Sequence, residues 1–260
     1  MILWGALSCL LAACATLPQG PWVGALPAGD QAIERLEARR LAVRSFVMQG
    51  TIQVKTPEGE IHGDHLINGV FPDRLRADVL GPFGQPVLSL LSTGSRLIVL
   101  DYRENQAFVG PPSRQNVARF LGLALSPAEI YTILSGSVPL LPHEKAQVAP
   151  VPEPGRAQLK LLGAGGAVSQ ALVFSLSDFA VRRAWLEEWT GRDRPGANLE
   201  CLFDSFVSQG QGNYPRNIEV KDHNQRRIAL ASDQLTLNQP VDGALFEMAI
   251  PAGIQVRELK

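Results

Sequence analysis

Hydrophobic and polar residues alternate with a period of two over most of the chain, which is the pattern of half-buried β-strands. Leu75, Ala77 and Val79 alternate with Arg74, Arg76 and Asp78 in this way. Ile52 and Val54 begin the series, before a Thr-Pro-Glu-Gly turn at 56–59. Further strands are predicted at 60–71, 86–93, 96–102, 105–109, 157–162, 168–175, 179–189, 198–208, 215–222, 226–237 and 244–250. The pattern indicates a sheet of about eleven strands, mostly antiparallel.

Helical spacing replaces this alternation before and in the middle of the strands. Asp30 is a candidate N-cap for a helix over 31–48, where apolar residues recur every three or four positions. A short helix is predicted at 113–123. Ser126, Pro127 and Glu129 have the spacing of a capping box that opens another helix. Its apolar stripe consists of Ile130, Ile133 and Leu134, and it should stop at Gly136 and Pro139.

These elements predict a mainly β (α+β) protein with one domain over 30–257. The segment 142–154 is rich in proline and is interpreted as a loop rather than a domain boundary. No internal repeat or interdomain linker is visible in the sequence.

The first residues have the character of an export signal followed by a lipid attachment site. Residues 1–13 are almost wholly apolar but too few to cross a bilayer as a helix, which takes about 20 residues. Leu11-Ala12-Ala13-Cys14 resembles the bacterial lipobox, in which the cysteine thiol carries the lipid. We therefore expect residues 1–13 to be a lipoprotein signal peptide and Cys14 the lipidated residue. The alternative is an ordinary signal with an incidental cysteine.

If Cys14 is lipidated, residues 14–29 are the tether between the lipid and the domain, and their Pro- and Gly-rich part suits that role. Ala15 after the cysteine favours the outer membrane and a periplasm-facing domain.

The composition narrows the class of protein. A formal net charge of −1 argues against a nucleic-acid partner, which needs clustered positive charge. Hydrophobic residues make up 45% of the chain, enough for a full core. Cys201 is alone in the body and is interpreted as a buried apolar residue on a strand.

No catalytic or metal-binding motif is found. His62 and His65 lie three apart on a predicted strand, so they should point to opposite faces and not share a metal. No Ser/His/Asp set or nucleophile elbow occurs. The sequence thus predicts no enzyme activity and no cofactor.

Three short motifs are similar to those of the outer-membrane lipoprotein receptor LolB and its LolA-like relatives. The segment 76–84, Arg-Ala-Asp-Val-Leu-Gly-Pro-Phe-Gly, resembles a strand of that family followed by its Pro-apolar-Gly turn. The segment 121–139 resembles the family's central helical segment, which ends Leu-x-Gly-x-Pro. The third match is a late hairpin, with Tyr-Pro-Arg-Asn-Ile-Glu-Val at 214–220 and Arg-Ile-Ala-Leu at 227–230.

The resemblance implies an incomplete antiparallel β-barrel with an N-terminal helix, central capping helices and a cavity for acyl chains. It implies an outer-membrane lipoprotein that assists transfer of lipoproteins or lipids to that membrane or their insertion into it. A soluble periplasmic carrier would be a partner. The family's protruding, membrane-inserting loop would correspond to Pro82, Phe83 and Gly84; the alternative is that Phe83 packs into the core. Alternation of apolar residues predicts the cavity wall, although a filled core would show the same pattern: Ile52, Val54, Leu75, Val79, Leu88, Leu90, Ile130 and Leu134.

The chain also departs from this family. Extra length at 142–154 and 187–198, and tryptophans at Trp185 and Trp189, have no counterpart in the pattern. A second hypothesis is therefore a non-catalytic envelope scaffold that binds a protein partner. The presence of a cavity would favour the carrier, and exposed tryptophans without a cavity would favour the scaffold.

Overall fold

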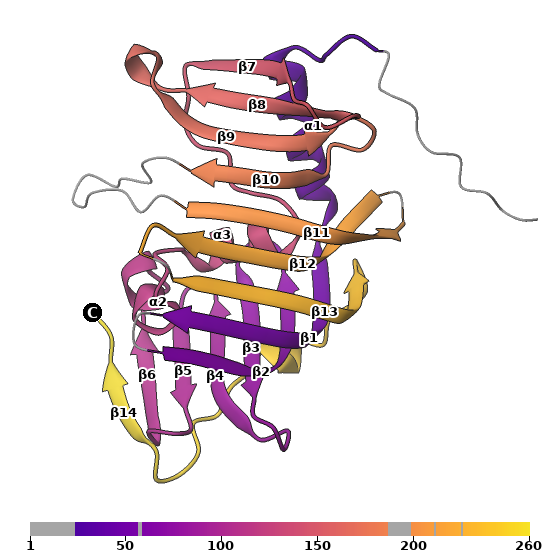
Figure 1. Cartoon of the computed structure of the whole chain (residues 1–260). Helices are drawn as coiled ribbons and strands as arrows, with labels where there is room; N and C mark the ends of the chain where they lie inside the picture. The colour runs from indigo at the N-terminus through magenta and orange to yellow at the C-terminus, as the bar shows by residue number, and fades with distance from the viewer. Residues whose placement is uncertain (1–23, 57–58, 187–198, 211, 225) are drawn as a thin grey trace, which may run out of the picture.

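The protein is built on one curled, unclosed sheet of fourteen strands, seen in a computed structural model (Figure 1). The structure describes residues 24–56, 59–186, 199–210, 212–224 and 226–260. The strand order is β14-β6-β5-β4-β3-β2-β1-β13-β12-β11-β10-β9-β8-β7. Neighbouring strands are antiparallel except β14 and β6, which are parallel. The incomplete antiparallel barrel expected from the sequence is confirmed, with fourteen strands instead of about eleven.

Most strands lie close to their predicted positions. Their bounds are β1 Ser45–Thr56, β2 Gly59–Val70, β3 Arg74–Leu80, β4 Pro86–Thr93, β5 Leu97–Asp101, β6 Gln106–Gly110, β7 Lys145–Pro150, β8 Arg156–Leu162, β9 Val168–Ser175, β10 Val181–Leu186, β11 Leu199–Gln209, β12 Gly212–Asp222, β13 Arg227–Leu237 and β14 Gln255–Glu258. In Figure 1, β3–β6 run behind β11–β13, β1 and β2, and the two central helices lie between these layers. The curl therefore encloses α2 and α3.

Three α-helices accompany the sheet: α1 Gly29–Ala42, α2 Arg114–Leu121 and α3 Pro127–Leu134. Ser113 caps α2 by accepting from the backbone N–H of Asn116, and Gly122 ends that helix with a φ of 71°. Only glycine adopts such a backbone readily. The predicted capping box of α3 is confirmed, because Ser126 and Glu129 each accept a hydrogen bond from the other's backbone N–H.

The predicted helix at 31–48 was wrong at both ends. The N-cap is Ala28, and Asp30 lies inside the first turn, where its charge favours the helix dipole. The helix stops at Ala42, and Val43 is already extended. Residues 43–48 contain β-branched and aromatic side chains that begin strand β1, and Val43 and Val47 fit helical spacing only by coincidence.

Two edge strands were missed, and one predicted strand is not a strand. The segment interpreted as a loop at 142–154 contains β7, an edge strand, where Pro150 costs no hydrogen bond of the ladder. β14 is exposed along its length and lies on the other edge. The strand expected at 244–250 is instead a 3-10 turn, Gly243–Phe246, followed by irregular chain.

The C-terminal segment covers the outer face of β3–β6. Phe246, with Leu245 and Met248 partly buried beside it, packs on a second apolar cluster formed by Leu91, Ile98, Leu100 and Ala107. The main core lies inside the curl. Successive residues of one strand therefore serve different cores: Leu90 belongs to the inner core and Leu91 to the outer one.

Candidate functional site

An apolar cavity of about 100 Å³ lies inside the curl, beneath the central helices. Its walls come from β1–β4, from β12 and β13, and from α2, α3 and the link between them. Seven of the eight residues predicted for the cavity line it: Ile52, Leu75, Val79, Leu88, Leu90, Ile130 and Leu134. Val54 is not among the lining residues. It pairs with Ile61 of β2 and Ile228 of β13. Val54 faces the same side of β1 as Ile52 but lies closer to the β1–β2 hairpin.

Sequence reasoning missed more than half of the wall. The missed apolar residues are Ile67, Ala77, Leu121, Leu123, Leu125, Ile133, Ile218, Val220, Ile228 and Leu230. Alternation at 218–220 and 228–230 was a usable signal for a shared face. Which strands meet across the curl depends on sheet topology, which local periodicity does not contain.

Two polar residues, His65 and Asp78, also border the cavity. The Asp78 side chain points to the outer face of β3, because it alternates with Leu75, Ala77 and Val79 along the strand. Asp78 is satisfied: its carboxylate accepts from the Ser89 hydroxyl at 2.5 Å and from Arg76 Nε at 2.9 Å. His65 is 1% exposed, and burial lowers its pKa, opposed by the Thr51 backbone and by the charges of Asp64 and Asp233. His62, by contrast, lies on the outer face near Glu60, so the two histidines face opposite sides as expected.

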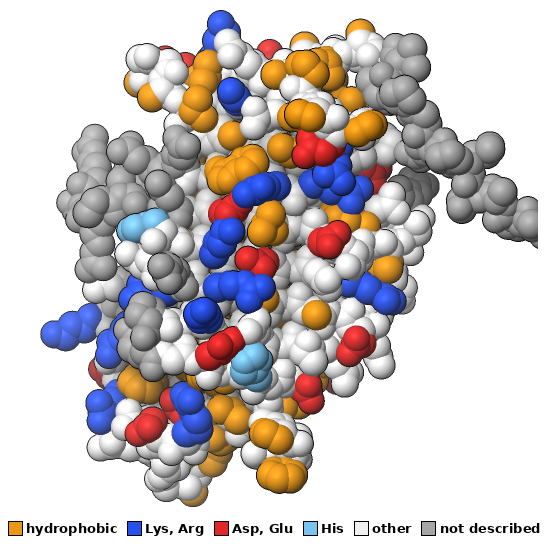
Figure 2. All heavy atoms as spheres, in the orientation of Figure 1, with side chains coloured by type: hydrophobic (Ala, Val, Ile, Leu, Met, Phe, Trp, Pro, Cys, Tyr) orange, Lys and Arg blue, Asp and Glu red, His pale blue; other side chains and the backbone are white. Residues whose placement is uncertain are grey.

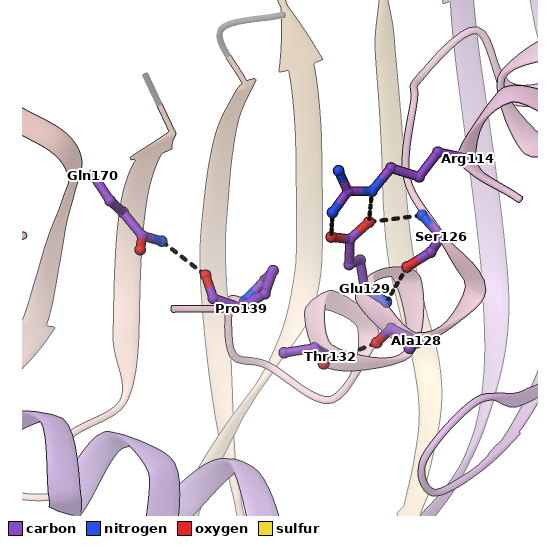
Figure 3. Close-up of polar contacts among 7 residues, drawn as sticks. All are labelled: Arg114, Ser126, Ala128, Glu129, Thr132, Pro139 and Gln170. Carbon is purple, nitrogen blue, oxygen red and sulfur yellow. Dashed lines mark hydrogen bonds and ion pairs between the residues drawn. The ribbon is translucent and has the colours of Figure 1, made fainter. Parts of the chain in front are cut away.

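A network of polar contacts fixes the two helices that cover the cavity (Figure 3). Arg114 of α2 forms a bidentate ion pair with Glu129 of α3, with 2.8 Å between Arg114 Nε and Glu129 Oε2. The same carboxylate accepts the Ser126 backbone N–H at 2.7 Å. Glu129 thus joins α2 to α3 and caps α3 with one side chain.

The chain leaving α3 is fastened to the sheet by Gln170, a fully buried residue of β9. Its amide donates to the Pro139 carbonyl at 3.0 Å (Figure 3). The amide oxygen accepts from the Leu141 N–H at 2.9 Å. Tyr131 of α3 donates to the Val43 carbonyl at 3.1 Å, where α1 leads into β1. The helical cover is therefore held at α2, at β9 and at the start of β1.

The turn between β3 and β4 presents Phe83 to solvent. Phe83 is 92% exposed, far more than any other large apolar residue that the structure describes. The turn is ordered by hydrogen bonds from Gly81 N to the Gln85 carbonyl at 2.8 Å and from Phe83 N to the Gln85 side chain at 3.1 Å. Gly84 has a φ of 75°, which this turn requires. Val79 and Leu88, the cavity pair nearest this turn, place it at one end of the cavity.

A larger, more polar hollow of about 970 Å³ lies on the outer face of β1, β2 and β11–β13. Figure 2 shows Lys and Arg interspersed with Asp and Glu over this face. The guanidinium of Arg227 in this hollow is already engaged, since it contacts Glu219 at 2.7 Å and Gln53 at 2.8 Å.

Two kinds of reactive group, a metal centre and an activated thiol, can be checked among the described residues. Within the described ranges, no group of three or more His, Cys, Asp or Glu could hold a metal ion. Cys201 is fully buried on β11, and burial, with the nearby charge of Glu200, raises its pKa to about 12. A thiol with such a pKa is a poor nucleophile at neutral pH.

Within the described ranges, no helix is long and apolar enough to cross a membrane. Cys14 and Trp189 lie outside the described residues.

Solved structures share this curled, unclosed sheet, and the resemblance seen in the sequence is confirmed at the level of the fold. A LolA superfamily protein from Nitrosomonas europaea superposes with a TM-score of 0.54 at 14% identity, covering 85% of this chain and 99% of that one. A DUF1329 family protein from Desulfovibrio piger gives 0.56 at 11% identity, covering 85% and 98%. A putative outer membrane lipoprotein-sorting protein domain from Vibrio parahaemolyticus gives 0.44 at 10% identity, covering 84% and 95%.

No protein-family model matches the sequence, and no curated protein matches it. At 11–14% identity, the Nitrosomonas europaea and Desulfovibrio piger proteins show the fold alone. The features of this chain that bear on its function are the apolar cavity and the turn that exposes Phe83.

Proposed function

We propose that this protein is an outer-membrane lipoprotein that binds acyl chains in the cavity beneath α2 and α3. It would assist transfer of lipoproteins or lipids to the outer membrane or their insertion into it. The observation that carries the proposal is a cavity with almost wholly aliphatic walls, whose Val79–Leu88 end lies next to the turn that exposes Phe83. Each methylene buried from water contributes about 0.8 kcal/mol, so binding needs no specific polar contact.

The cavity is small for this purpose. Its volume of about 100 Å³ is below the roughly 300–1,000 Å³ usual for ligand pockets. An acyl chain can therefore enter only if α2 and α3 move outward from the sheet. The helices take no part in the sheet ladder, so they can move outward without breaking strand pairing. The movement would expose apolar residues that α3 now buries in the core, such as Ile133 and Leu134.

The test is native mass spectrometry of the exported chain carrying Cys14→Ser, purified from the periplasmic fraction without detergent. Removing the proposed lipidation site keeps the protein's own anchor from being mistaken for a ligand. The proposal expects co-purified acyl species that a fluorescent fatty acid displaces. A clean apo mass without probe binding would reject it.

The turn formed by Pro82, Phe83 and Gly84 is proposed to insert into the membrane during transfer. Moving a Phe side chain from water into an apolar phase contributes about 1.5–3 kcal/mol, which suits a transient contact. Phe83→Glu should weaken binding to phospholipid vesicles by about tenfold or more, with unchanged thermal stability because the side chain contacts little. Val256→Glu is the matched control, since Val256 is 53% exposed but lies on β14. Equal effects of the two substitutions would reject the role of the turn.

Lipidation at Cys14 and the outer-membrane location can be tested together. The unmodified chain should incorporate radiolabelled palmitate and fractionate with the outer membrane, and Cys14→Ser should lose both properties. Fractionation of the unmodified chain with the soluble periplasm would contradict this part of the proposal.

The alternative of a protein-binding scaffold has less support. Trp185 is half-buried, with the Arg183 guanidinium over its ring at 4.5 Å, rather than presented as an exposed aromatic. The cavity itself favours the carrier.

A further inference from the structure

Leu75 lies at the end of the cavity that is farthest from the turn between β3 and β4. On the inner face of β3, Leu75, Ala77 and Val79 line the cavity in three successive rows, and Val79 is the one beside that turn. Gly69 and Ser92, which pair with Leu75 on either side, do not line the cavity. The row of Leu75, a residue that is 1% exposed, is therefore the last one that the cavity reaches.

Aromatic rings fill the space around Leu75. Gly69 of β2 pairs with Leu75 on one side and with Phe46 of β1 on the other. A Cβ at Gly69 would lie 2.4 Å from the Phe46 ring, so the ring covers this glycine on the inner face of the sheet. Tyr131 of α3 contacts Phe46, with 5.1 Å between ring centroids, and Phe71 in the β2–β3 turn, with 6.0 Å. The three rings therefore join the sheet to the helical cover and close this end of the cavity.

The rows of β3 give the cavity a length. A strand advances about 3.3 Å per residue, so Leu75 and Val79 are about 13 Å apart. Outward movement of α2 and α3 would widen the cavity but leave this length unchanged, because the rows are set by strand pairing. An extended chain advances about 1.2 Å per bond, since an extended residue of three bonds covers about 3.3–3.6 Å. About ten methylenes therefore reach from the row of Val79 to Leu75.

The charge of a fatty acid fixes which end enters. Burying an unpaired carboxylate is costly, so the carboxylate stays in water and the methyl end goes deepest. We propose that the methyl end stops against Leu75, backed by Phe46 and Tyr131, so that this row sets the length of acyl chain that the protein prefers. Each methylene that leaves water tightens binding about fourfold. The gain should end when the methyl group reaches Leu75, because further methylenes remain in water.

This inference rests on the proposed acyl binding and deepens it by naming the residue that sets chain length. The full chain carrying Cys14→Ser is titrated with saturated fatty acids of 8 to 18 carbons, in steps of one carbon, by displacement of a fluorescent fatty acid. The dissociation constant should fall about fourfold per carbon among the shorter acids. It should become constant beyond a break at about twelve carbons, which is the ten methylenes of the cavity with the two ends of the acid.

Variants separate a stop for the ligand from a merely structural leucine. Leu75→Ala removes three carbon atoms at the deep end, so the break should move to acids about two carbons longer. Acids beyond the original break should then bind more than tenfold more tightly, relative to the shorter acids, than they do in the parent chain. Leu172→Ala is the matched control, because Leu172 is fully buried on β9 and does not line the cavity. It should lower the thermal stability and leave the break in place.

The outcomes are distinct. If no fatty acid binds the parent chain, acyl binding and this inference both fail. If affinity rises through the whole series, or the break stays in place in Leu75→Ala, the inference alone fails. A break that moves equally in Leu172→Ala also overturns it, since general loosening of the core would then be the cause. Should Leu75→Ala not fold, Leu75→Val, which removes one carbon atom, must move the break by about one carbon; an unchanged break would overturn the inference.

Discussion

Glu129 is the side chain whose loss should most clearly loosen the cover of the cavity. It is 7% exposed, holds Arg114 of α2 through a bidentate ion pair, and caps α3 through the Ser126 N–H at 2.7 Å. Glu129→Ala removes both functions. Loss of the helix cap costs about 1 kcal/mol. The charge-assisted pair contributes about 1–2 kcal/mol, at the low end because the Arg114 side chain is 36% exposed and can turn to water.

The expected loss of unfolding free energy is therefore about 2–3 kcal/mol, measured by urea denaturation of the Cys14→Ser chain. Glu129→Gln, which keeps a carbonyl acceptor for the cap but loses the charge, should lose about half as much. Glu37→Ala is the matched control. Glu37 pairs with Arg40 within α1, but both side chains are about one-quarter to one-third exposed, so the loss should stay below about 0.5 kcal/mol.

The same substitution should speed release of a bound fatty-acid probe, because α2 and α3 separate more easily from each other and the cover of the cavity loosens. Equal stability of Glu129→Ala and the parent chain would refute the assignment of Glu129 as the link between the helices. Lost stability with an unchanged release rate would show that ligand exchange does not depend on these helices.

Three further predictions concern the interior. Tyr131→Phe should lose about 1 kcal/mol of unfolding free energy, since Tyr131 donates to the Val43 carbonyl inside the core; no loss in urea titration would contradict that bond. Cys201, with a pKa of about 12, should react with a thiol reagent only as fast as the protein unfolds; rapid labelling of folded protein would contradict its burial. His65, with a pKa lowered from 6.5, leaves the folded protein binding fewer protons than the unfolded chain below that pH. Stability should therefore fall as pH drops from 6.5 to 5, and fall less in His65→Leu; identical slopes would contradict the lowered pKa.

The fold could be predicted where local rules decide the structure. β4 and β9 lie at the predicted residues, and the capping box at Ser126 and Glu129 placed the start of α3 correctly. Prediction failed at 43–48, where the apolar residues fit helical spacing but the chain forms the start of β1. It also failed at the edge strand β7, because an edge strand needs no buried face and tolerates Pro150. A third failure is at 244–250, where the chain forms a 3-10 turn and irregular structure, and Phe246 packs on the outer apolar cluster instead of extending a strand.

The candidate site was predictable in part for similar reasons. Leu75, Val79, Leu88 and Leu90 follow from alternation. Phe83 was expected only from the family resemblance, with packing into the core as the alternative, and the structure shows it exposed. The contribution of Ile218 and Leu230 could not be predicted, because it depends on the curl that brings β12 and β13 opposite β3 and β4. His65 was seen only as part of a His-x-x-His motif. Its place in the cavity required the register across Gly50.

The central claim is that an acyl chain occupies the cavity under α2 and α3, and filling that cavity tests it most directly. Ala77 lines the cavity, so Ala77→Leu places three more carbon atoms in the space that the ligand needs. Ala231→Leu adds the same atoms on the exposed outer face of β13 and is the control. The dissociation constant of a fluorescent fatty acid, measured on the folded chains carrying Cys14→Ser, should rise at least tenfold for Ala77→Leu and stay unchanged for Ala231→Leu. Equal binding by all three chains, or none by the parent, would contradict the account.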